Sequence, residues 1–135
     1  MRLLSYFKND SNIFFELEYI RGQSLLNSII PKPNRVVRQN ANFYIAQVIL
    51  ALEHLHKHNV MHRDLKPENI MLSMENGGNV KIIDFGASKR LKAGDRTFTN
   101  TGTSVYFAPE VLSGIGHDHR IDIWQLGVLI SELLT

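Results

Sequence analysis

Residues 60–72 have the sequence VMHRDLKPENIML, which places one histidine, two basic residues, two acids and one asparagine between apolar residues. Buried strands and helices rarely carry charge at that density. The stretch lies between a helical pattern at residues 42–59 and a hairpin pattern at residues 69–85. We therefore predict a loop that regular structure fixes at both ends, which is a common place for catalytic groups.

The flanking predictions rest on the spacing of apolar and turn-forming residues. Residues 42–59 carry apolar side chains at helical i, i+3, i+4 spacing. Residues 69–85 contain two apolar runs around Asn-Gly-Gly-Asn at 76–79, which tolerates the positive φ of a hairpin turn. Residues 122–134 are apolar nearly all round, so we expect a helix that is buried on most faces.

The remaining segments predict shorter elements and one long loop. Residues 3–20 contain two extended runs, rich in aromatic and apolar side chains and joined by turn formers. A short helix is predicted for residues 23–30. It must end before Pro31, since the residue before a proline disfavours the helical conformation. Residues 86–108 are polar, rich in Gly and Thr and without periodicity, which is typical of a functional loop. Three large aromatic residues are expected in the core: Phe14, Phe15 and Trp124.

Four polar residues of this region can meet at one point. Asp64 and Asn69 are separated by five positions with Lys66 between them, and Asp84 follows at the far end of the predicted hairpin. A hairpin brings its two ends together. Carboxylate and amide oxygens such as those of Asn69 and Asp84 hold Mg²⁺, and a lysine can offset phosphate charge. Asp64, kept off the metal, can then accept or align the proton of a hydroxyl group.

Three motifs carry a resemblance to a known family. HRDLKPEN at residues 62–69, DFG at 84–86 and APE at 108–110 resemble the signature set of eukaryotic protein kinases, in family order. Lys66, two residues after Asp64, follows the serine/threonine pattern rather than the tyrosine pattern. The resemblance implies an ATP- and Mg²⁺-dependent enzyme that phosphorylates Ser or Thr hydroxyls of protein substrates.

The resemblance also assigns roles to single residues. Asp64 and Lys66 are the implied catalytic residues, and Asn69 and Asp84 the implied metal ligands. Leu17 corresponds to the gatekeeper that borders the adenine site. The implied ATP-binding residues are Leu17, Glu18, Ile20, Lys66, Glu68, Asn69, Met71 and Asp84. The implied structural residues are His62, Phe85 and Leu3 of the internal spine, together with Gly86, Thr103, Glu110 and Asp122.

Residues 86–110 look most like the group that contains the cyclic-nucleotide-dependent kinases. In that group Thr99 falls on the phosphorylated threonine of the activation loop, with Arg63 and Lys89 as partners of the phosphate. Two positions depart from the group. The dipeptide at 104–105 is Ser-Val where the group has Pro-Glu, and Ser24 stands where it has a glutamate that reads a basic substrate residue.

The resemblance implies an α+β fold of the protein-kinase type that is truncated within these residues. We expect residues 1–20 to supply two small-lobe strands and the hinge, and residues 21–135 the first part of the mainly helical large lobe. No Gly-rich phosphate loop and no strand lysine stand before residue 7, and the large-lobe helices that follow in the family are not among the 135 residues. We therefore expect this segment alone to be inactive. The alternative is a non-catalytic kinase-like fragment or scaffold remnant.

Bulk properties exclude other classes of function. The net charge is +2 and the pI is near 9.0, too mild to indicate nucleic acid or membrane as a partner. There is no cysteine, and no apolar run resembles a secretory signal, so we expect a soluble, cytoplasmic protein. His54 and His58 are spaced like helical metal ligands, but a partly exposed helix end explains them better. The oligomeric state is left open.

Overall fold

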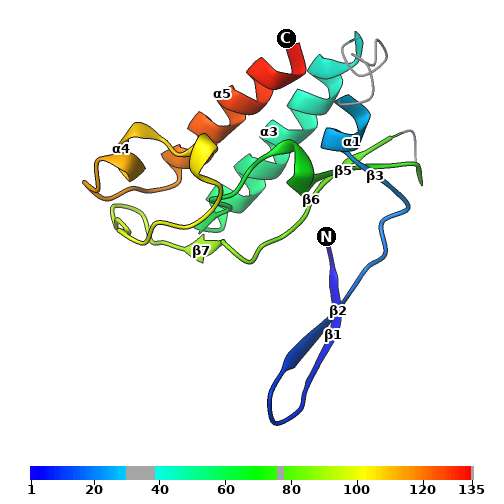
Figure 1. Cartoon of the computed structure of the whole chain (residues 1–135), viewed down its shortest axis with the longest axis horizontal. Helices are drawn as coiled ribbons and strands as arrows, with labels where there is room; N and C mark the ends of the chain where they lie inside the picture. The colour runs from blue at the N-terminus through cyan, green and yellow to red at the C-terminus, as the bar shows by residue number, and fades with distance from the viewer. Residues whose placement is uncertain (30–38, 76–77, 135) are drawn as a thin grey trace.

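The computed structural model describes residues 1–29, 39–75 and 78–134 (Figure 1). The α-helices are α1 (Leu25–Ile29), α3 (Ala41–Lys57), α4 (Pro109–Leu112) and α5 (Arg120–Leu134), and the 3₁₀ turns are η1 (Pro67–Asn69) and η3 (Ser104–Tyr106). The strands are β1 (Leu3–Lys8), β2 (Ile13–Leu17), β3 (Gly22–Ser24), β4 (Val60–Met61), β5 (Ile70–Ser73), β6 (Val80–Ile82) and β7 (Lys89–Arg90).

The predicted order of strands and helices is confirmed within the described residues. β1 pairs antiparallel with β2, and β5 pairs antiparallel with β6 in the register Ile70 to Ile82. β3 adds to the other edge of β5, and β4 forms a separate two-stranded sheet with β7. The predicted stop of the first helix at Pro31 and the first half of the 76–79 turn lie outside the described residues.

The main core lies between α3, α5 and the β5–β6 hairpin. Val48 and Leu52 of α3, one helical turn apart, are 1% exposed. They belong to one buried cluster with members from α1, the 62–69 loop, the hairpin and α5: Leu25, Leu65, Ile70, Ile82, Leu126, Leu129 and Leu133. A second buried cluster joins β4, the segment after β7, α4 and the start of α5 through Met61, Leu91, Ala108, Val111 and Ile121. The first cluster includes Leu65 of the 62–69 loop, and the second includes Met61, which directly precedes the loop.

The prediction that residues 122–134 are buried on most faces is wrong for one face of α5. Ile123 is 54% and Trp124 47% exposed, because they border an open groove that α4 and α5 share. Phe14 and Phe15 are also exposed, contrary to prediction. The β1–β2 hairpin stands apart from the helices (Figure 1), so Phe14 stacks on Phe7 across the hairpin instead of entering the core.

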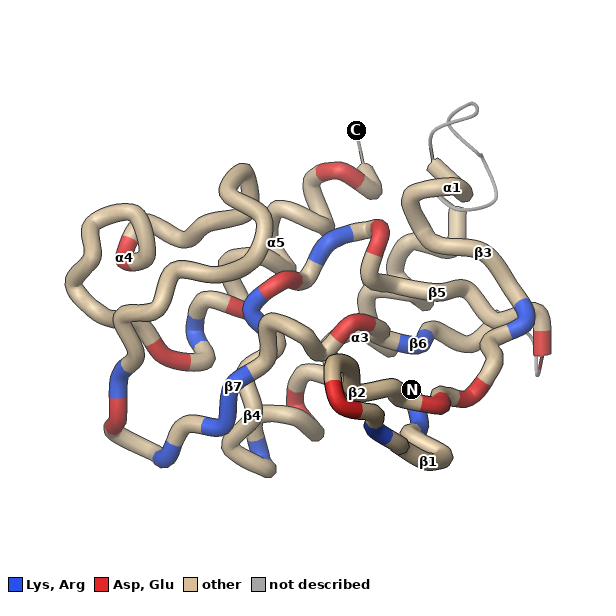
Figure 2. Tube along the Cα trace, turned by 60° about the horizontal axis from the view of Figure 1, so that its bottom comes forward, with Lys and Arg blue, Asp and Glu red and all other residues tan. Residues whose placement is uncertain are grey.

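The predicted loop at residues 86–108 contains two short regular pieces, β7 and η3. Within residues 1–29, 39–75 and 78–134, charged positions of both signs are spread over the trace (Figure 2), without one continuous basic stripe. Among the described residues, no helix is long and apolar enough to cross a bilayer.

Candidate active site

The start of the 62–69 loop is held by a buried carboxylate of α5. Asp122 is fully buried and accepts the backbone N–H of His62 at 2.9 Å and of Arg63 at 2.8 Å. His56 of α3 lies 2.8 Å from the same carboxylate through its Nε2. Arg63 has φ of +71°, which is unfavourable for a residue with a side chain, so the loop needs such bonds to keep this shape.

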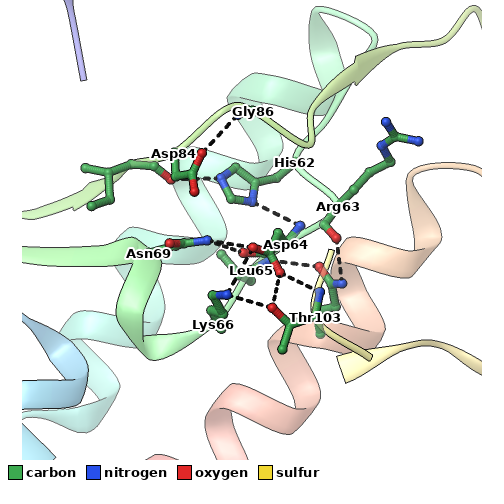
Figure 3. A network of polar contacts seen from close by, with 11 residues as sticks. His62, Arg63, Asp64, Leu65, Lys66, Asn69, Asp84, Gly86 and Thr103 are labelled. Atoms are coloured by element: carbon green, nitrogen blue, oxygen red, sulfur yellow. Dashed lines mark hydrogen bonds and ion pairs between the residues drawn. The ribbon is translucent and has the colours of Figure 1, made fainter. Parts of the chain in front are cut away.

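The carboxylate of Asp64 is the centre of the polar network in Figure 3. Its Oδ1 accepts bonds from the backbone N–H of Thr103 at 2.8 Å and from the Thr103 hydroxyl at 2.7 Å. Its Oδ2 lies 3.2 Å from Lys66 Nζ and 3.1 Å from Asn69 Nδ2. Lys66 also donates to Thr103 Oγ1 at 2.6 Å. The side chain of Asp64 is therefore fixed in direction by three residues from two segments.

These contacts set the protonation state of Asp64. Burial raises the pKa of the carboxyl, but the hydrogen bonds from Thr103 and Lys66 and the Lys66 charge outweigh burial, so the pKa lies below its ordinary value. Asp64 is thus ionised at neutral pH. An ionised carboxylate can accept a hydrogen bond from an incoming hydroxyl group and orient it.

Asn69 and Asp84 offer oxygen ligands beside this network. Asn69 Nδ2 donates to Asp64 O at 2.8 Å, and Figure 3 shows the amide oxygen turned away from Asp64. Asp84 has φ of +58° and accepts the N–H of Gly86 at 3.1 Å. No group of three or more His, Cys, Asp or Glu among the described residues could hold a metal by itself. One amide oxygen and one carboxylate fit Mg²⁺, which keeps its other positions for water and substrate phosphates.

A cavity of about 590 Å³ lies between the β1–β2 hairpin and the segment at residues 84–86. It is lined by Met1, Leu3, Phe15, Leu17, Asp84, Phe85 and Gly86. Phe85 also meets His62 edge to face, with ring centroids 5.2 Å apart. The structure thus brings Leu17 to the cavity that Asp84 borders. Leu3 and Phe85 line the same cavity, and the Phe85 ring contacts His62, so the three residues follow one another in a series.

The predicted hinge residues lie beside the β5–β6 hairpin. The Glu18 carboxylate, just after β2, is 2.9 Å from Lys81 Nζ of β6. Lys81 stands opposite Met71 in the strand register, so Glu18 and Met71 border the same part of the sheet. Ile20 is half-buried in the linker to β3, and Glu68 is exposed on η1. Lys81 thus links Glu18 to the strand pair that carries Met71, whereas Glu68 lies on the 3₁₀ turn that precedes β5.

The residues around Thr99 are arranged differently from the prediction in one respect. Arg63 Nη1 donates to Thr99 O at 3.4 Å, and Arg63 Nε donates to Ala87 O at 2.6 Å. Lys89 Nζ, however, donates to the hydroxyl of Thr97 at 2.7 Å. Thr97 is 3% exposed, while Thr99 is exposed. Thr99 is thus open to modification with Arg63 close by, and Lys89 would have to leave Thr97 to reach a phosphate there.

Two other predictions concern Glu110 and the histidine pair His54 and His58. Glu110 of α4 borders a cavity of about 300 Å³ together with Arg120 and Asp118. His54 and His58 have ring centroids 4.4 Å apart, and His58 Nδ1 lies 2.8 Å from His54 O. The contact of His58 with a backbone carbonyl favours the interpretation as an exposed helix end over a metal site.

Sequence reasoning missed Gln125, which makes two bonds to the 62–69 loop. It also missed the contact of His56 with Asp122 and the bond from the hydroxyl of Tyr106 to Glu132, 2.9 Å to each carboxylate oxygen. Burial and then the Glu132 carboxylate raise the pKa of Tyr106. For Gln125 the available signal was its spacing of three positions from Asp122 within an apolar helix, since such positions share one helix face.

Comparison with known proteins identifies the same family as the motifs of the site. The model of the protein kinase domain matches residues 1–135. The chain is 41% identical over all of its 135 residues to a cAMP-dependent protein kinase catalytic subunit of Dictyostelium discoideum, of which it covers 20%. It is 42% identical over 95% of its length to cAMP-dependent protein kinase catalytic subunit 3 of Drosophila melanogaster, of which it covers 21%.

The cAMP-dependent protein kinase type 3 of Saccharomyces cerevisiae is 42% identical over the whole chain. The chain covers 33% of that protein, so it spans a third or less of these three relatives. The matched region includes every residue of the network around Asp64. On the match of the family model and these similarities, the chain belongs to the protein kinase domain family, and its fold is a partial kinase domain.

Proposed function

We propose that the protein containing these residues is a serine/threonine protein kinase that transfers the γ-phosphate of ATP to a protein hydroxyl group. The observation that carries the proposal is the fixed carboxylate of Asp64, which receives bonds from Thr103, Lys66 and Asn69. Each of these residues suits one task of phosphoryl transfer, in which positioning and charge stabilisation do most of the work.

Asp64 receives the substrate hydroxyl. Because its pKa is low, it acts mainly by orienting the O–H for attack and accepts the proton as the bond to phosphorus forms. Lys66, already 3.2 Å from that carboxylate, offsets the charge of the transferred phosphoryl group. Asn69 and Asp84 would hold Mg²⁺, which supplies neutralisation of the phosphate oxygens when bound.

The nucleotide would lie between the β1–β2 hairpin and the β5–β6 hairpin. Leu17 would border the adenine, and Glu18 and Ile20 would offer backbone groups to its edge. Met71 would lie beneath the ring, and Glu68 would contribute from η1. The ion pair of Glu18 with Lys81 of β6 supports this arrangement, because Lys81 stands opposite Met71 where β6 pairs with β5.

The proposal assigns residues 1–20 to the small lobe and hinge and residues 21–135 to the large lobe. Catalytic competence belongs to the whole protein, since the chain spans a third or less of the relatives compared above. The proposed regulation is phosphorylation of Thr99, which Arg63 would recognise. Protein substrates with Ser or Thr are part of the proposal, as is a cytoplasmic location, where ATP is available.

The test is an assay of the full-length protein with Mg·ATP and a mixture of Ser-, Thr- and Tyr-containing peptides. We expect phosphate on Ser or Thr only. Asp84→Asn should lower the rate by about 10²-fold or more, because a preorganised charge-stabilising group is typically worth that much. The matched control is Asp10→Asn, in the exposed turn between β1 and β2. Equal rates for the two variants, or transfer to Tyr alone, would contradict the proposal.

A further inference from the structure

We propose that Gln125 is a positioning residue of this active site, whose carboxamide fixes the backbone on both sides of Asp64. The inference deepens the proposed function and rests on it. Gln125 lies on α5, and its side chain bonds the backbone of Arg63 and Leu65 rather than the Asp64 carboxylate. Its effect on the reaction would therefore pass through the loop it holds.

The geometry uses both ends of the Gln125 carboxamide. Oε1 accepts the backbone N–H of Leu65 at 3.0 Å, and Nε2 donates to the backbone carbonyl of Arg63 at 3.0 Å. Gln125 is 1% exposed, so water cannot replace either bond. A carboxamide offers one acceptor and one donor side by side, whereas a carboxylate lacks the donor and an apolar side chain lacks both.

Gln125 and Asp122 act on adjacent parts of the same backbone. They lie three positions apart on one face of α5. Asp122 accepts the backbone N–H groups of His62 and Arg63. Gln125 donates to the Arg63 carbonyl and accepts the N–H of Leu65. The carbonyl of Asp64 is bound by Asn69 Nδ2 at 2.8 Å. The peptide groups on either side of the Asp64 Cα are therefore each bonded to a side chain.

The Arg63 carbonyl shows why this contact matters for Asp64. Arg63 has φ of +71°, and its carbonyl points toward Gly102, where an added Cβ would lie only 2.4 Å from the oxygen. Gly102 directly precedes Thr103, which binds the Asp64 carboxylate. A rotation of the Arg63–Asp64 peptide would thus move Asp64 and press on the segment that orients it. The Gln125 amide opposes that rotation from the side of α5.

The alternative is that Gln125 only fills space in the helix interface. In that case an apolar side chain of equal length would serve as well, since replacing a buried polar group by an apolar one of the same shape can be nearly neutral for stability. The variant Gln125→Met separates the two readings. A control for loss of stability alone is Leu133→Ala, which removes volume from the main core two helical turns further along α5.

The experiment measures kcat and KM for ATP on the full-length protein, with kcat normalised to the folded fraction. We expect Gln125→Met to lower kcat about tenfold to a hundredfold, because a small misplacement of a reacting group has effects of that size. KM for ATP should change by about twofold at most, since the nucleotide contacts are kept. Leu133→Ala should lower the unfolding temperature and leave the normalised kcat unchanged. A kcat of Gln125→Met within about twofold of the wild type would overturn the inference.

Amide hydrogen exchange makes the result independent of activity. The Leu65 amide should exchange about tenfold faster or more in Gln125→Met than in the wild type. In Leu133→Ala it should exchange no faster than the neighbouring amides of the loop do. If the wild-type protein transfers no phosphate, the proposed function fails, while the exchange of Leu65 still tests the bond. Unchanged exchange of Leu65 in Gln125→Met would then overturn the positioning role by itself.

Discussion

The 62–69 loop and the β1–β2 hairpin are built in opposite ways. Nearly all of the loop is buried, and its backbone groups are bonded to side chains of α5 and of Asn69. Every residue of β1 and β2 is exposed, and an ion pair at the end of the hairpin, Glu18 with Lys81, joins it to β6. The side chain of Asp64 is thus held by the interior, whereas Leu17, which is assigned to the adenine, stands on an exposed element.

The difference follows from the energetics of buried and exposed polar contacts. A buried donor or acceptor without a partner costs about 1–3 kcal/mol, so a fully bonded loop has one shape. An exposed ion pair between flexible side chains contributes little in water. We therefore expect the hairpin to change its angle relative to β6 easily, while the 62–69 loop keeps its shape. Substitutions in the loop and in the hairpin should therefore differ in their effects.

The largest effect is expected for Asp122→Ala. It leaves the N–H groups of His62 and Arg63 and the His56 ring without their carboxylate. We expect the free energy of unfolding to fall by about 3 kcal/mol or more, measured by denaturant unfolding of the full-length protein. Asp10→Ala in the hairpin turn is the control and should change it by about 0.5 kcal/mol at most. Similar losses would show that the loop is held no more firmly than the hairpin.

A smaller effect, on rate, is expected for Thr103→Val. The valine keeps the backbone N–H bond to Asp64 but removes the hydroxyl that bonds Asp64 and Lys66. We expect kcat to fall about tenfold or more, since a hydrogen bond to a charged group contributes about 1.5–3 kcal/mol. Thr101→Val, two residues earlier, is the control. Steady-state kinetics at saturating ATP and peptide measure both, and equal kcat values would remove the role of the Thr103 hydroxyl.

The pH dependence tests the same bonds. The pKa of Asp64 is lower in the folded protein than in the unfolded chain. The ionised carboxylate therefore contributes fully to stability above the ordinary Asp pKa of about 3.9, and this contribution is lost as pH falls through the lower pKa of the folded protein. In Thr103→Val the pKa should rise toward the ordinary value, because one of the bonds to the ionised carboxylate is gone. The acid limb of kcat/KM against pH should therefore move to higher pH in the variant. An acid limb at the same pH in both proteins would exclude Asp64 as the titrating group.

The smallest effect is expected for Lys81→Met, which removes the ion pair with Glu18. The hydrogen bond to Lys81 is the main reason why the pKa of Glu18 is lowered. Both side chains of the pair are half-buried, so water still reaches and weakens the contact. We expect no measurable change in the unfolding temperature, and faster amide exchange in β1 and β2 than in the wild type. A large fall in the unfolding temperature would mean that the hairpin is an integral part of the core.

The sequence predicted the features that depend on local pattern. The helix at α3, the hairpins β1–β2 and β5–β6, and the meeting of Asp64, Lys66 and Asn69 follow from periodicity, turn residues and motif spacing. What could not be predicted depends on side-chain geometry between distant segments. Lys89, predicted as a partner of Thr99, bonds the hydroxyl of Thr97 instead, and that choice depends on how the whole segment is placed.

Burial was predicted less well than secondary structure. Trp124 and Phe15 are large and apolar, but their exposure depends on which neighbours reach their faces, and a periodic pattern does not contain that information. Gln125 shows the opposite case. A single polar residue within an apolar helix gives no hint of its partners, although its spacing from Asp122 places both on one face of α5.

The most direct test of the account is the rate of Asp64→Asn in the full-length protein, with ATP and the peptide that the wild type phosphorylates. Asparagine keeps the size of the side chain but removes the charge that accepts the hydroxyl proton. The account predicts that kcat falls by about 10²–10⁴-fold, with the unfolding temperature close to that of the wild type. An unchanged kcat in a folded Asp64→Asn protein would contradict the central claim that Asp64 orients the attacking hydroxyl.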